Sequence, residues 1–232
     1  MIASIKKEGD DMVTSQQLRE RRIPQRIVTY IFGLFCSALA MNLFVRADLG
    51  NSAVSTSAVV FSQWQGLSLG TCTLGLYCLF LVAQIVILRR KFQWINLGQV
   101  PFAMIFSAFV DLVGAAMPAF AVESMLARWL VQLLGMVLVS VGTLSFVGTE
   151  LVPLPVEGFL ITMSQVTNTP FHKWKTCIDC TFAGLAIVSS LLLFGQLEGV
   201  GVGTIVLAVG TGWMMGKIKP HLPKQMQNWQ LH

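Results

Sequence analysis

The stretch that decides the fold is LVPLPVEGFL, residues 151–160. It places two prolines, Pro153 and Pro155, and one acid, Glu157, inside an otherwise apolar chain. A continuous membrane-spanning helix rarely has this combination in its interior, because proline removes a backbone hydrogen bond and an acid is costly in hydrocarbon. The stretch therefore predicts an interruption, either a short helix that begins at Pro155 or a surface loop.

The 232-residue chain is too apolar for a soluble domain. Apolar residues make up 54% of the sequence and charged residues only 12%, about half the charge of an average soluble domain. This composition predicts a multi-pass membrane protein whose main partner is the lipid bilayer. The net charge of +5 lies mostly near the ends of apolar runs, which is typical of topology signals, and we expect no binding to nucleic acid.

Six apolar runs are long enough to cross about 30 Å of hydrocarbon as helices. They cover approximately residues 27–45, 70–88, 97–117, 125–147, 174–194 and 200–216. Two further stretches, 52–64 and 153–166, are semi-apolar but too short to span. We expect these two to enter the membrane and return as re-entrant segments or half-helices; ordinary surface loops are the alternative.

The basic residues favour the re-entrant interpretation. They gather at residues 21–26, 89–91, 173–175 and 217–219. If both short stretches return to the side from which they came, all four clusters and both termini lie on one side, which the positive-inside rule makes the cytoplasm. The predicted organisation is a tail (1–26), a first membrane repeat (27–120), a second membrane repeat (121–217) and a second tail (218–232).

The second half of the chain repeats the first with a shift of 102 residues. Matching pairs include Gly33 with Gly135, Phe44 with Phe146, Cys78 with Cys180, and Ser62-Gln63 with Ser164-Gln165. Because each half has three crossings, an odd number, the second half must be inverted. The fold class predicted is an all-α membrane protein with six transmembrane helices, arranged as two inverted three-helix repeats that each carry a half-helix. Such an architecture is typical of transporters.

The two short stretches supply the first candidate site residues. Pro155 suits the first turn of a helix, and Glu157 would lie in that turn, where the helix dipole favours an acid. The matching stretch begins near Ser52 and carries Ser55 and Thr56. Two half-helix N-termini that meet near the midplane would form a site for a polar or anionic group.

The remaining candidates are charged residues within the apolar runs. Lys173, Lys175 and Asp179 lie at the start of the fifth run, and Asp111 lies in the third. Asp179 either forms a local ion pair with Lys175 or has a functional role. Asp111 either pairs with Arg46 or handles protons or cations. No metal-binding, cofactor-binding or catalytic motif is recognisable, so we expect no metal, no cofactor and no enzymatic activity.

Three segments carry a resemblance to a known family. They are VRADLGNSAVST (45–56), LVPLPVEGFLITMSQVTNTPFHKWKTCIDCTF (151–182) and EGVGVGTIVLAVGTGWMMG (198–216). In order and spacing they resemble the leucine-glycine-rich loop, its second-half counterpart and the glycine-rich last span of bacterial YczE/YyaS/YitT-type membrane proteins. The resemblance implies a six-span repeat in the bacterial cytoplasmic membrane, and no established substrate.

These features predict a small secondary transporter or permease for an unidentified polar or anionic small molecule, with proton coupling left open. The alternative is a non-transporting membrane partner that assembles or stabilises another complex. The small size and the glycine-rich last span fit that alternative equally well, and a homodimer is compatible with either.

The predicted topology can be tested by single-cysteine labelling from outside intact cells, in a cysteine-free background. Cysteines that replace Arg90 or Lys173 should stay unlabelled, because their basic clusters face the cytoplasm. Cysteines that replace Glu123 or Glu198 should react. Strong labelling at position 90 or 173 would contradict the six-crossing topology.

Overall fold

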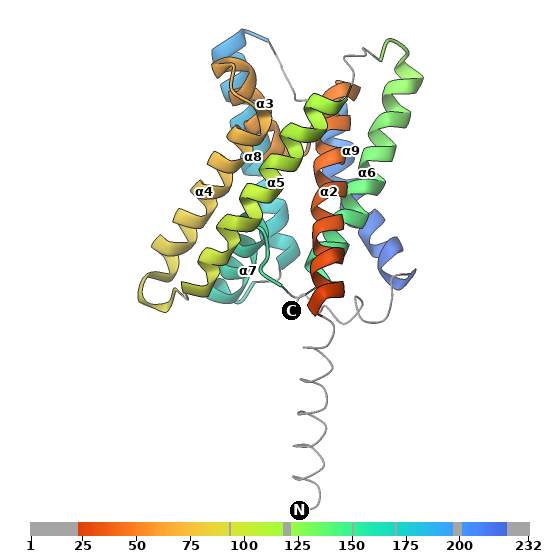
Figure 1. Ribbon diagram of the computed structural model, residues 1–232. Helices are drawn as coiled ribbons and strands as arrows, with labels where there is room; N and C mark the ends of the chain where they lie inside the picture. Colours follow the sequence, from red (N-terminus) through yellow and green to blue (C-terminus); the bar gives the residue numbers. More distant parts are fainter. Residues whose placement is uncertain are drawn as a thin grey trace, which may run out of the picture.

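The computed structural model describes residues 23–92, 94–117, 122–149, 151–169, 171–196 and 201–221. Regular structure in these ranges is entirely helical, so the all-α class is confirmed for them (Figure 1). The helices are α2 (Ile23–Ala47), α3 (Ala53–Gln65), α4 (Leu69–Leu88), α5 (Gln99–Ala116), α6 (Met125–Val147), α7 (Pro155–Thr167), α8 (Phe171–Phe194) and α9 (Val202–Ile218). Short 3-10 turns follow α4, precede α5 and follow α9.

Five helices in the described part of the chain are long and apolar enough to cross a membrane, which identifies the chain as membrane-embedded. They are α2, α4, α6, α8 and α5 together with the turn before it. The sixth predicted crossing lies in α9, whose 17 residues make it shorter than the other five. Apolar side chains on these helices are widely exposed, as lipid-facing positions require.

The two short stretches are helices, so the surface-loop alternative does not describe their backbone. α3 and α7 have 13 residues each and are about 20 Å long. As predicted, Pro155 occupies the first turn of α7. Each short helix ends at a residue in the left-handed conformation, Gly66 after α3 and Asn168 after α7. These two residues are 102 positions apart.

The short helices pack within the bundle and against the opposite half of the chain. α3 lies along α8, and α7 lies along α4. The amide of Gln84 on α4 donates to the carbonyl oxygen of Pro155 at 3.0 Å and exchanges hydrogen bonds with Gln99 of α5. Gln84 and Gln99 are buried, so this network holds the start of α7 inside the protein.

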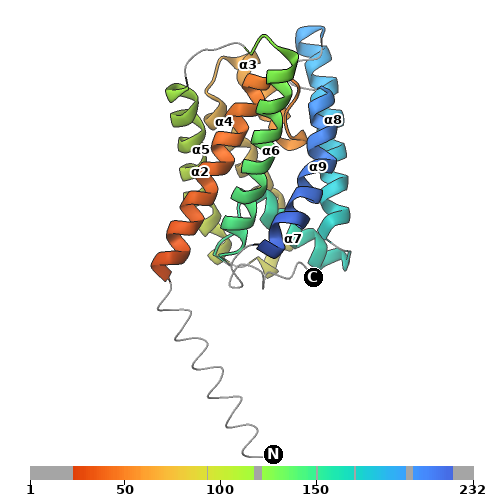
Figure 2. The same cartoon turned by 90° about the vertical axis from the view of Figure 1, so that its right-hand side faces the viewer.

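The centre of the bundle is the pair α2 and α6, which run side by side in opposite directions (Figures 1 and 2). A Cβ atom on Gly33 would lie 2.8 Å from the backbone nitrogen of Phe146, and one on Gly135 would lie 2.5 Å from the ring of Phe44. The absence of side chains at both glycines therefore lets the helices approach closely. The contact is reciprocal: Gly33 meets Phe146, and the equivalent Gly135, 102 residues later, meets Phe44, which is equivalent to Phe146.

Two hydrogen bonds also correspond to each other in the two halves, because their donors and their acceptors are each 102 positions apart. The hydroxyl of Tyr30 donates to the carbonyl oxygen of Val152, and the amide of Gln132 donates to that of Gly50, both at 2.9 Å. Each bond joins a central helix to the non-helical segment before a short helix. The starts of α3 and α7 are therefore positioned by equivalent contacts.

The α2–α6 contact predicts how glycine substitutions affect stability. Gly33→Ala should lower the thermal unfolding midpoint in detergent, because the new methyl group would also lie 2.7 Å from the carbonyl oxygen of Gly142. Overpacking of this kind costs about 1–3 kcal/mol. Gly184→Ala on α8 is the matched control, since nothing lies within 4 Å of its Cβ position. Equal midpoints for the two variants would contradict close packing at Gly33.

Candidate functional site

A cavity of about 140 Å³ lies in the middle of the bundle, and all eight described α-helices contribute to its wall. The first turns of α3 and α7 both line it, through Ser52–Ser55 and through Leu154, Val156 and Glu157. Neither of these helix N-termini is capped by the side chain of its N-cap residue. The partial positive charges of two helix dipoles are therefore directed toward one cavity.

Glu157 is the least satisfied charged residue of the wall. Its Oε2 atom is buried and has no hydrogen-bond partner among the described residues. The Oγ atom of Ser37 on α2, which also lines the cavity, is in the same condition. Buried polar atoms are normally hydrogen-bonded to protein or water, so these two atoms mark the cavity as a place for a polar ligand or for water.

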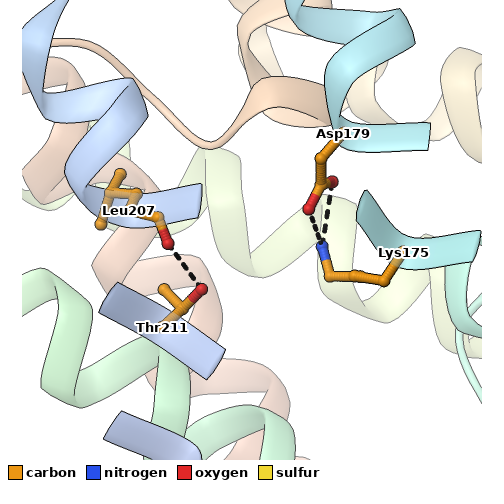
Figure 3. Close-up of polar contacts among 4 residues, drawn as sticks. All are labelled: Lys175, Asp179, Leu207 and Thr211. Atoms are coloured by element: carbon orange, nitrogen blue, oxygen red, sulfur yellow. Dashed lines mark hydrogen bonds and ion pairs between the residues drawn. The ribbon is translucent and has the colours of Figure 1, made fainter. Parts of the chain in front are cut away.

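An ion pair lies on the α8 side of the cavity. The ammonium group of Lys175 donates to both carboxylate oxygens of Asp179, at 3.0 and 2.8 Å. Both residues line the wall, so the local ion pair expected from their spacing exists and also faces the cavity. Figure 3 shows this ion pair and, at some distance from it, Leu207 and Thr211 of α9, which line the same cavity.

The structure thus brings four of the seven predicted site residues together: Ser55, Glu157, Lys175 and Asp179. Two of the other three lie apart from the wall. Thr56 is fully buried and donates its hydroxyl to the carbonyl oxygen of Ser52, while Lys173 is exposed.

Asp111, the third, has a different environment from the predicted site. Its carboxylate accepts hydrogen bonds from the hydroxyl of Ser68 and from the backbone N–H of Gly70, both at 2.7 Å. It therefore binds the N-terminus of α4 from the neighbouring helix α5. Arg46, its expected partner, donates to the carbonyl oxygen of Met117 at 3.4 Å.

Sequence reasoning missed most residues of the wall, among them the polar residues Thr73 and Tyr77 of α4. The repeat contained the signal that could have found them. Adding 102 to their numbers gives Lys175 and Asp179, which were candidates. Among the described residues no group of three or more histidine, cysteine, aspartate or glutamate side chains could hold a metal ion.

The comparisons with known proteins agree with the resemblance described from the sequence. The chain is 22% identical to the uncharacterized protein YyaS of Bacillus subtilis (strain 168) over 198 residues, which cover 82% of this chain and 90% of that protein. No solved structure matches the chain. Residues 24–220 match the family of unknown function DUF6198, and the chain therefore belongs to that family.

Proposed function

We propose that this protein is a small secondary transporter or permease that carries a small polar molecule across the bacterial cytoplasmic membrane. One observation carries the proposal. The first turns of both short helices line the same cavity, which contains a carboxylate atom that has no hydrogen-bond partner among the described residues. Broken helices whose N-termini face a central site are the usual way in which secondary transporters bind polar substrates.

We further propose that the chain is an inverted repeat of α2–α5 and α6–α9. In support, α3 and α7 begin at positions 53 and 155, and α5 and α9 end at positions 116 and 218. Both pairs of positions differ by 102. The central helices contact each other reciprocally, and Figure 1 shows that they run in opposite directions.

In this arrangement α9 is the sixth crossing and α3 and α7 are re-entrant. The 17 residues of α9 rise about 26 Å, which a locally thinner bilayer accommodates at modest cost. Leu49, Gly50 and Asn51 before α3 and Leu154 before α7 are buried in the protein, as irregular backbone at membrane depth must be. The basic clusters favour a cytoplasmic location for both termini in this arrangement.

The proposal can be tested with proteoliposomes that contain purified protein. They are incubated with a defined mixture of amino acids, amines, organic acids and sugars, and their contents are measured by mass spectrometry. At least one compound should enter faster than into empty liposomes. Glu157→Gln keeps the shape but removes the charge and should lower this rate at least about tenfold, a loss of binding of about 1.4 kcal/mol.

Glu123→Gln is the matched control, because Glu123 is an exposed acid outside the cavity; its rate should equal that of the unmodified protein. Entry no faster than into empty liposomes would reject transport of these compounds. The non-transporting membrane partner would then be preferred, and co-purification from native membranes would look for the complex it assembles. Equal rates for all three proteins would reject Glu157 as part of the site.

A further inference from the structure

We propose that the cavity binds a small monovalent organic cation, with the carboxylate of Glu157 as its counterion. The inference deepens the proposed function by naming the substrate class of the same site. It starts from the buried Oε2 atom of Glu157, which lacks a hydrogen-bond partner among the described residues. A buried carboxylate without a cationic partner of its own is costly even at a helix N-terminus, and a cationic ligand would lower that cost.

The charges of the wall leave one negative charge uncompensated. Among the described residues, the charged side chains that line the cavity are those of Glu157, Lys175 and Asp179. The ammonium group of Lys175 is bound by both oxygens of Asp179, so these two charges neutralise each other. The carboxylate of Glu157 remains, and a monovalent cation balances it.

An anionic ligand, which the helix dipoles alone would favour, fits this wall less well. It would have to displace Asp179 from Lys175 and would then lie near two carboxylates, where like charges repel. The positive end of α7 is already occupied by Glu157, which lies in its first turn. The N-terminus of α3 offers only a partial charge and the hydroxyl groups of Ser52 and Ser55.

The repeat also indicates which hydrogen-bonding groups the ligand would meet. The residues equivalent to Glu157, Lys175 and Asp179 in the first half are Ser55, Thr73 and Tyr77, and these three line the cavity as well. Because α7 packs along α4 and α3 packs along α8, Glu157 lies on the side of Thr73 and Tyr77, and Ser55 lies on the side of the Lys175–Asp179 ion pair. Hydroxyl groups therefore lie next to the charged groups, and a compact cation that also forms hydrogen bonds matches this wall.

The charge preference can be tested with propionamidinium, propionamide and propionate, which have nearly the same shape and differ in charge. Each is added at millimolar concentration to detergent-purified protein, and the thermal unfolding midpoint is measured. Propionamidinium should raise the midpoint by about 3 °C at ten times its dissociation constant. Propionamide and propionate should raise it by less than a third of that shift.

Four variants assign the effect to Glu157. Glu157→Gln should abolish the propionamidinium shift, while Glu157→Asp, which keeps the charge, should retain at least half of it. The exposed control Glu123→Gln should retain all of it. In Asp179→Asn, Lys175 is free to pair with Glu157. The ratio of the dissociation constant of propionate to that of propionamidinium should therefore fall about tenfold or more.

Several results would overturn the inference: a larger shift with propionate, a full shift in Glu157→Gln, an unchanged preference in Asp179→Asn, or no shift with any compound. If Glu157→Gln does not fold, the unmodified protein, Glu157→Asp and Asp179→Asn decide the question. Binding in detergent does not require transport. Cation binding without flux would therefore support the cation site and reject the transport function. Flux of neutral or anionic compounds without cation binding would support the transport function and reject the cation site.

Discussion

The close approach of α2 and α6 is the constraint on which the rest of the structure depends. Gly33 and Gly135 have no side chain, so each helix packs against the phenylalanine of the other, Phe146 and Phe44. These central helices also bind the segments that lead into the short helices, through the hydrogen bonds of Tyr30 and Gln132. A wider separation of α2 and α6 would move the starts of α3 and α7 apart, and the cavity wall that both helices build would be lost.

The two halves are alike in backbone but differ in chemistry. On the first-half side, the carbonyl oxygen of Gly70 accepts a hydrogen bond from Ser107, and Asp111 binds the backbone N–H of the same glycine, which joins α4 tightly to α5. The equivalent positions in the second half are His172, Val209 and Trp213. The side chains of Val209 and Trp213 cannot form the two hydrogen bonds that Ser107 and Asp111 make to Gly70. The described charged residues of the cavity wall, in contrast, belong to the second half.

Much of the fold could be predicted because its determinants are local. Pro155 and Glu157 predicted a helix that begins at that point, because proline and an acid are both favoured in a first helical turn. The structure begins α7 at Pro155. The i, i+4 spacing of Lys175 and Asp179 likewise predicted their ion pair, and the shift of 102 residues predicted which positions of the two halves correspond.

The sequence by itself therefore determined the membrane class, the positions of most helices, the two short helices and four residues of the cavity wall. Only the tertiary structure decided that Asp111 binds the start of α4, that Lys173 and Thr56 lie apart from the wall, and that Thr73 and Tyr77 belong to it. The physical reason is that helix spacing indicates which residues share a face. Which helix covers that face depends on long-range packing. In this protein each short helix packs against a long helix of the other half, α3 against α8 and α7 against α4.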